Sequence, residues 1–185
     1  MNICLYGAAS NTIAPLYIQK TEELGEEMAR RGHRLVFGGG NGGLMGAAAR
    51  GVRRGGGQLI GVAPRFFRPD GVLFEDCTEF IFTETMRERK QTMEDHADAF
   101  IMSPGGIGTL EEFFEIYTLR QLGRIRKPLA IFDINDYFAP LRVMLSHAVR
   151  EGFVREEALA LCLCEDTPAV LLDRLEVEAE KNKKA

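Results

Sequence analysis

The segment from Pro104 to Thr109, with the sequence PGGIGT, has the composition of a loop that holds a phosphate group. Its glycines permit backbone conformations that other residues avoid, so that several N–H groups can approach one oxyanion. A helix that begins near Thr109 would direct the positive end of its dipole at the same anion, and the threonine hydroxyl adds a donor. The lysine that completes a Walker A loop is missing, so triphosphate chemistry is not implied.

Glu112 follows this loop, where a carboxylate could act on a bound ligand. The segment from Thr109 to Glu112 also fits a capping box, with Thr109 as the N-cap and Glu112 at the third helical position. In that interpretation Glu112 bonds the backbone and has no chemical role. Capping boxes are common at helix starts, so the pattern alone leaves both interpretations open. Glu111, one position away, points elsewhere around the helix.

A second glycine-rich segment contains Gly38, Gly40 and Gly43, which fit the GxGxxG spacing of dinucleotide-binding loops. This spacing is a weak signal by itself. A dinucleotide site also needs an acidic residue about 20 residues further on, and the chain has none there before Asp70. NAD is therefore disfavoured, and a tight strand-to-helix turn is the competing explanation for the glycines.

A cluster of charged residues at 86–90 places Arg89 and Lys90 next to each other. At a strand-to-helix junction the two side chains could pair with a phosphate, the arginine through two hydrogen bonds and the lysine as a point charge. A solvated first helical turn would give the same pattern.

Short apolar segments alternate with amphipathic ones, and these elements must position the loops. Predicted strands span Asn2–Tyr6, Arg34–Phe37, Gln58–Val62, Glu79–Thr83, Ala99–Ser103, Leu129–Ile134 and Ala160–Cys164. Predicted helices span Thr12–Arg31, Leu44–Arg54, Arg87–Ala97, Leu110–Leu122, Tyr137–Glu151 and Pro168–Glu180. This order predicts an α/β fold with a doubly wound parallel sheet of about seven strands and helices on both faces.

Ligands of such sheets bind beyond the carboxyl ends of the strands. Three predicted strand ends carry unusual loops, namely Gly7–Ser10, Gly38–Gly43 and Pro104–Thr109. We expect these loops to meet at one edge of the sheet. The long irregular connection Phe66–Asp76 is expected to line the same site.

The composition predicts one globular domain over 1–185, with a charged tail at 176–185 that frays. A net charge of −4 argues against general nucleic-acid binding. The sequence shows no membrane span and no signal peptide, which predicts a cytoplasmic protein. The four cysteines form no CxxC pair and no metal-spaced cluster, so we expect reduced core thiols. From Met28 to Pro69 eight arginines and no acidic residue occur, which indicates either a local positive field or a solvated surface.

Together these motifs make the chain resemble the Lonely Guy family of cytokinin-activating phosphoribohydrolases, many of which are labelled lysine decarboxylase-like. The family signature PGGxGTxxE matches Pro104–Glu112 in full, and the upstream RK pair matches Arg89 and Lys90. A third motif, GGGxxGLMG, matches Gly38–Gly46. Shorter matches at 121–123, 127–128 and 151–153 extend the resemblance over nearly the whole chain.

The resemblance implies a modified Rossmann fold and hydrolysis of the N-glycosidic bond of a purine (cytokinin) riboside 5′-monophosphate or AMP, giving free base and ribose 5-phosphate. It also implies a homodimer, and neither a metal nor a redox cofactor. Arg89 and Glu112 match the catalytic pair of the family. The positions expected to bind substrate are Lys90, Gly105, Gly106, Ile107, Gly108, Thr109, Leu110 and Glu111, to which we add Met86, Gly39 and Ser10 from the neighbouring segments.

The chain departs from the family pattern near the expected pocket. Arg87 stands where the family usually has His, Leu119 where it has Trp, and Ala8–Ser10 where it often has Gly-Ser-Ser. An acidic contact to the nucleotide is expected from Asp70 or Glu75, and the sequence does not choose between them. These departures bear on base preference more than on the reaction. The alternatives are a nucleotide carrier without turnover and a general salvage nucleosidase.

Overall fold

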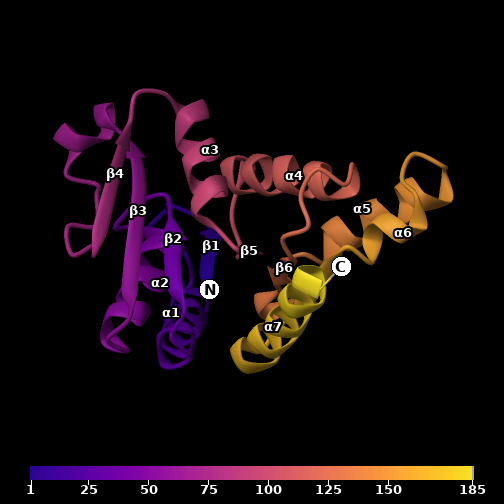
Figure 1. Ribbon diagram of the computed structural model, residues 1–185, viewed down its shortest axis with the longest axis horizontal. Coiled ribbons are helices and arrows are strands. Elements are labelled where there is room, and N and C mark those ends of the chain that lie inside the picture. The colour runs from indigo at the N-terminus through magenta and orange to yellow at the C-terminus, as the bar shows by residue number, and fades with distance from the viewer. Residues whose placement is uncertain (185) are drawn as a thin grey trace.

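Seven short apolar segments form one parallel sheet in the computed structural model, which describes residues 1–184 (Figure 1). The strands are β1 (Asn2–Tyr6), β2 (Arg34–Phe37), β3 (Gln58–Pro64), β4 (Glu79–Thr83), β5 (Ala99–Met102), β6 (Leu129–Phe132) and β7 (Cys162–Glu165). The sheet order is β4-β3-β2-β1-β5-β6-β7, and each neighbouring pair is parallel. Coverage on both faces explains why the central strands are apolar almost throughout. The predicted fold is confirmed.

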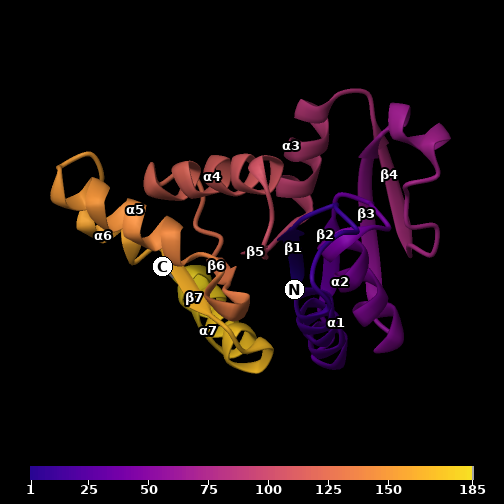
Figure 2. The same cartoon turned by 180° about the vertical axis from the view of Figure 1, so that it is seen from behind.

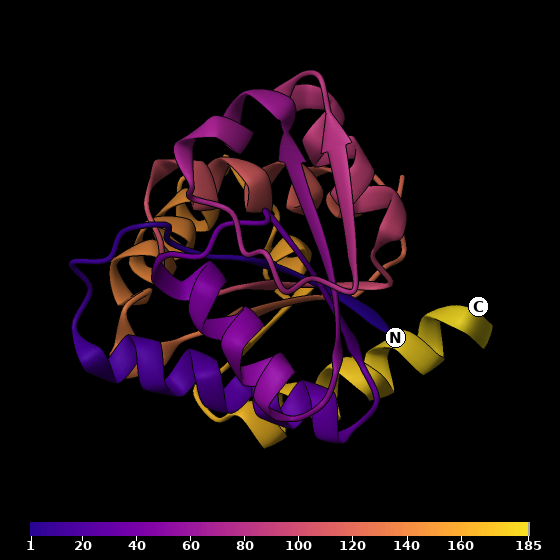
Figure 3. The ribbon, with the colours of Figure 1, turned by 90° about the vertical axis from the view of Figure 1, so that its left-hand side faces the viewer.

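Helices cover the two faces of this sheet. They are α1 (Pro15–Arg30), α2 (Gly43–Arg54), α3 (Met86–His96), α4 (Ile107–Gln121), α5 (Ala139–Arg150), α6 (Glu156–Leu159) and α7 (Pro168–Lys184). Successive strand residues point to opposite faces. In β1, Ile3 packs with α1, α2 and α7, whereas Cys4 packs with α3 and α4. Figure 3, which faces the β4 edge, shows α1 and α2 below the strands and α3 and α4 above them.

The direction in which the chain winds reverses between β1 and β5. From β1 the chain moves outward through β2 and β3 to β4, and α3 then returns it to β5 beside β1. Such a switch point leaves a crevice beyond the carboxyl ends of the two central strands. The loops that follow β1 and β5 are two of the glycine-containing loops identified in the sequence.

Several element boundaries differ from the predicted ones. Helix α1 begins at Pro15, a residue favoured at the first helical position, rather than at Thr12. Helix α4 begins at Ile107 rather than Leu110, because Gly106 takes the extended N-cap conformation. The connection after β3 starts with a 3₁₀ turn, η1 (Arg65–Asp70), and another, η2 (Ile134–Asp136), precedes α5. The segment 176–184, predicted to fray, belongs to α7, and residue 185 lies outside the described residues.

Helices α5 and α6 form an arm that extends away from the sheet (Figures 1 and 2). All of α5 is described, and none of its residues is buried. Its exposed apolar side chains include Val143 and Met144, and Phe153 beyond its end is 86% exposed. None of the helices in the described part of the chain combines the length and apolar character that a membrane crossing requires.

Candidate active site

A cavity of about 650 Å³ lies at the switch point of the sheet. The loops after β1, β2 and β5 all contribute to it, so the predicted meeting of the three loops is confirmed. The irregular connection after β3 closes one side. The lining residues are Gly7, Ala8, Ala9, Ser10, Asn11, Gly38, Gly40, Asn41, Gly42, Met45, Phe67, Val72, Leu73, Met86, Arg89, Gly106, Gly108, Thr109 and Glu112.

Arg89 and Glu112 form an ion pair in this cavity. Nη1 of Arg89 donates to Oε1 of Glu112 at 2.6 Å, and the two side chains are only 8% and 11% exposed. Nε of Arg89 donates to the backbone carbonyl of Val62 at 3.2 Å. The guanidinium is therefore fixed between β3 and α4, and it holds the carboxylate in one position.

The local structure of α3 and α4 explains how the two side chains meet. A capping box between Thr85 and Glu88 starts α3, which places Arg89 at the end of the first turn, facing the sheet. Glu112 lies one turn after Thr109 on α4, and both line the cavity. The capping-box interpretation of Thr109 and Glu112 is wrong, because the N-cap of α4 is Gly106 and Glu112 bonds Arg89 instead.

The protonation of Glu112 is governed by two opposing effects. Burial disfavours the charged carboxylate and raises its pKa above the ordinary value, whereas the Arg89 guanidinium lowers it. The first effect is larger, so the net pKa of Glu112 is raised. Because the buried carboxylate has little solvent to stabilise its charge, its attraction to a positive charge that develops beside it is strong.

Lys90 and Glu111 form a second link between the same two helices, on the outside of the cavity. The ammonium of Lys90 pairs with Glu111 and, at 2.8 Å, with Glu115. These hydrogen bonds raise the pKa of Lys90, the one to Glu111 being the larger cause. The predicted divergence of Glu111 from Glu112 is confirmed.

The glycine-rich loop leads into the start of α4, which begins at Ile107, two residues before the predicted start near Thr109. Thr109 is 5% exposed, and a Cβ on Gly105 would overlap its side chain, which explains the glycine at that position. The hydroxyl of Tyr137 donates to the carbonyl of Gly105 at 2.8 Å and so fixes the loop from the β6 side. The first backbone N–H groups of α4 have no partner within the helix, and they face the cavity where Gly106 and Gly108 line it.

The glycine-rich segment after β2 is tied to the connection after β3. The N–H of Asn41 donates to Val72 at 2.9 Å, and the N–H of Phe74 donates to Gly39 at 2.8 Å. This pairing places Phe67, Val72 and Leu73 at the rim, so the prediction that the connection lines the site is confirmed. Among the described residues, neither acidic candidate of this connection, Asp70 or Glu75, lines the cavity.

The expected substrate-binding positions divide into two groups. Ser10, Met86, Gly106, Gly108 and Thr109 line the cavity, together with the expected catalytic pair. The others are Gly39, Lys90, Gly105, Ile107, Leu110 and Glu111, which lie outside its lining in the described chain.

Sequence reasoning missed one polar side chain of the site. Asn11 lines the cavity and accepts a 3.0 Å hydrogen bond from the N–H of Gly43. Its position directly after the first loop was the signal available in the sequence. Within the described part of the chain, no residue after Glu112 lines the cavity, and no group of three or more His, Cys, Asp or Glu side chains could hold a metal ion.

The arginine-rich segment before Pro69 does not converge on the cavity. Seven of its eight arginines pair with carboxylates elsewhere on the surface, and Arg68 lies over the ring of Phe82. The interpretation of a solvated surface is therefore the correct one.

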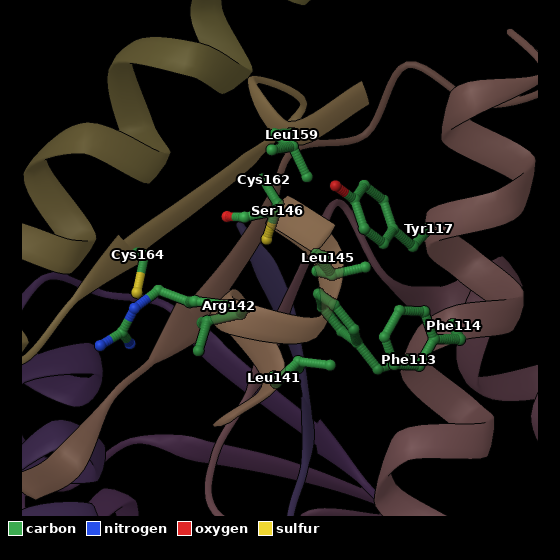
Figure 4. Close-up of a pocket in the computed structure, with 11 residues that line it drawn as sticks. Phe113, Phe114, Tyr117, Leu141, Arg142, Leu145, Ser146, Leu159, Cys162 and Cys164 are labelled. Carbon is green, nitrogen blue, oxygen red and sulfur yellow. The ribbon is translucent and has the colours of Figure 1, made fainter. Parts of the chain in front are cut away.

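A smaller cavity of about 170 Å³ lies between α4, α5 and β7 (Figure 4). Aromatic rings from α4 face aliphatic side chains of α5 across it, and Cys162 and Cys164 line it from β7. Its only charged lining residue in the described chain, Arg142, pairs with Asp133. The apolar lining makes this cavity unsuited to the binding of a charged nucleotide.

The chain is similar to curated plant proteins over nearly its whole length. It is 38% identical to a cytokinin riboside 5′-monophosphate phosphoribohydrolase of Oryza sativa subsp. japonica, over 94% of this chain and 72% of the relative. It is 36% identical to another such enzyme from Arabidopsis thaliana, over 94% of this chain and 80% of the relative. The family described as "Possible lysine decarboxylase" matches residues 45–175.

Solved structures show the same fold at low sequence identity. A molybdenum cofactor binding protein from Rippkaea orientalis superposes with a TM-score of 0.71 at 18% identity, covering 95% of this chain and 94% of that one. A molybdenum cofactor carrier protein from Chlamydomonas reinhardtii gives a TM-score of 0.72 at 21% identity, covering 97% and 98%. The extent of the sequence matches shows that the chain belongs to the possible lysine decarboxylase family, in the branch of the Lonely Guy phosphoribohydrolases.

Proposed function

We propose that this protein hydrolyses the N-glycosidic bond of a purine riboside 5′-monophosphate, either a cytokinin riboside monophosphate or AMP, to free base and ribose 5-phosphate. The observation that carries the proposal is the buried ion pair of Arg89 and Glu112, placed in one cavity with the N-terminus of α4. Relatives that are 36–38% identical and named for this activity support it.

The geometry supports a division of labour in this reaction. The N-terminus of α4 and the hydroxyl of Thr109 bind the 5′-phosphate. As the bond from C1′ to the base nitrogen breaks, its electron pair goes to the base and positive charge builds on the ribose. The Glu112 carboxylate stabilises that charge or takes a proton from the water whose oxygen bonds C1′. Arg89 holds Glu112 in place and offers positive charge to the departing base. The proton that the attacking water loses ends on the base nitrogen, so that water supplies both the hydroxyl group on C1′ and the proton on the free base.

We propose the same substrate-binding positions as the sequence suggests, in two roles. Ser10, Met86, Gly106, Gly108 and Thr109 contact the nucleotide directly, since they line the cavity. The remaining positions act by shaping the phosphate loop or the helix pair around it, and they are Gly39, Lys90, Gly105, Ile107, Leu110 and Glu111. The phosphate provides binding energy remote from the reacting bond, which can be used to orient that bond.

We also propose that the protein is a cytoplasmic homodimer. The apolar side chains exposed on α5 and beyond it, such as Val143, Met144 and Phe153, support an interface there. The four cysteines are free thiols, as a reducing compartment favours. Light scattering tests the assembly, and a monomer in solution would refute the dimer.

Product analysis by chromatography tests the activity. The purified protein is incubated separately with AMP, with isopentenyladenosine 5′-monophosphate and with the riboside that lacks the phosphate. We expect free base from the monophosphates and none from the riboside, and the ratio between the two monophosphates distinguishes cytokinin activation from general salvage. Nucleotide binding without release of base would refute the enzyme and favour a carrier.

A further inference from the structure

Gly38 lies at the carboxyl end of β2, directly against the guanidinium of Arg89. A Cβ built on Gly38 would overlap Nη2 of Arg89 and would lie 3.0 Å from its Cζ. Such an approach is closer than real Cβ atoms adopt. The position therefore has room for Arg89 only because the residue has no side chain.

Arg89 cannot move away from an added methyl group without losing its own contacts. Its Nε is bonded to the carbonyl of Val62 on one side, and its Nη1 is bonded to Glu112 on the other. The side chain is 8% exposed, and the open space beside it is the cavity itself, so a guanidinium that turned aside would enter the space proposed for the substrate. A displaced guanidinium would carry Glu112 with it or leave that carboxylate without its partner.

Backbone conformation does not account for the glycine at this position. Gly39 and Gly43 have φ angles of +72° and +55°, which favour glycine. Gly38 is outside this left-handed group, so its backbone can accommodate alanine. The other close neighbour, the sulfur of Met45 at 3.0 Å, ends a flexible side chain that can adjust.

We propose that Gly38 is a positioning residue of the catalytic pair, whose missing side chain lets Arg89 lie between β2 and Glu112. The inference rests on the proposed function and adds a residue that lines the cavity and whose added side chain would meet Arg89. The Gly38→Ala variant should lower kcat at least about 30-fold, because a misplacement of about 1 Å can cost a hundredfold in rate. The KM for the nucleoside monophosphate should change less than about threefold, since the added methyl group would meet Arg89 and Met45 and the start of α4 is untouched.

A double-mutant cycle with Arg89→Lys isolates the cause. Lysine lacks the Nη2 atom that the added methyl group would meet, so Gly38→Ala should cost less than about twofold in kcat/KM on the Arg89→Lys background. Melting temperatures of the same four proteins, the wild type, the two single variants and the double variant, test the contact independently of turnover. Gly38→Ala should lower it by several degrees in the wild-type background and by about 1 °C or less in the Arg89→Lys background.

Gly57→Ala is the matched control. Its Cβ would lie 2.7 Å from Val52 and 2.8 Å from Ala29, between α1 and α2 and away from the cavity. This variant should melt at a lower temperature and keep its kcat. Equal losses from Gly38→Ala in both backgrounds, or an unchanged kcat, would overturn the role of Gly38. If the wild-type protein releases no base, the proposed function fails instead, and the melting cycle still tests the contact between Gly38 and Arg89.

Discussion

Replacing Glu112 by Gln removes the carboxylate charge and preserves the shape of the side chain and an acceptor for Arg89. At about 4 Å and an effective dielectric constant of about 20, a carboxylate attracts a unit positive charge by about 4 kcal/mol. If Glu112 comes this close to the anomeric carbon, the loss corresponds to roughly a thousandfold in rate. We therefore expect kcat of Glu112→Gln to fall about a thousandfold while KM changes less than about threefold, measured by chromatography of the released base.

The stability of the same variant tests the balance of forces on the pair. Loss of a charged partner from buried Arg89 would destabilise the protein. The raised pKa of Glu112 means, however, that burial disfavours its ionisation in the folded state, relative to the unfolded chain, by more than Arg89 favours it. We therefore expect an equal or higher melting temperature at pH 7, by up to about 3 °C.

Two results would refute this reasoning. Near-wild-type turnover would show that the Glu112 carboxylate has no chemical role. A melting temperature lowered by more than about 5 °C would show that the charged pair stabilises the fold. Glu115→Gln is the control on the same helix, because Glu115 pairs with Lys90 outside the cavity and its loss should change kcat less than about twofold.

Three further measurements follow from the structure. Tyr137→Phe removes the hydrogen bond to Gly105 and should raise the KM for nucleoside monophosphates about threefold, whereas Tyr117→Phe, whose hydroxyl bonds a distant carbonyl, should leave KM unchanged. In the pH profile of kcat/KM, the acid limb should have its midpoint above the ordinary pKa of a glutamate, because burial raises the pKa of Glu112. A midpoint at or below the ordinary pKa would contradict the role of Glu112 in the reaction. Hydrogen bonds from neighbouring arginines lower the pKa of Glu27 from 4.5 to about 2. Glu27→Gln should therefore reduce the free energy of unfolding, measured by urea titration, by about 1 kcal/mol at pH 7 and by progressively less as the pH falls from 4.5 to 2. A reduction that does not depend on pH would contradict this prediction.

The fold was predictable because its signals are local. Each strand is a short apolar segment that ends at glycine, proline or charge, and β1, β2 and β4 have the predicted bounds. The alternation of strand and helix then restricts the sheet to a doubly wound order. The start of α4 was misplaced because the sequence offers Thr109 as a good N-cap, and nothing local shows that Gly106 takes that conformation instead.

The site was predictable in its loops and less so in its side chains. Consecutive residues of a helix point about 100° apart, so Arg89 and Lys90 face different directions, and so do Glu111 and Glu112. In the described chain only Arg89 and Glu112 of these four line the cavity. Which member of each pair points inward depends on how α3 and α4 pack on the sheet. This contact joins residues 23 positions apart, and periodicity within either helix does not determine it.

The lining of the large cavity is complete by Glu112, and in the described chain the segment 113–184 contributes no residue to it. Apart from Tyr137, which supports Gly105, a change of sequence in that segment is therefore expected to act on assembly, surface charge or thermal behaviour more than on the chemistry. For engineering, a tag attached to the arm of α5 and α6 would leave the lining of the cavity intact and would test the proposed interface, since apolar side chains such as Val143 and Met144 are exposed there.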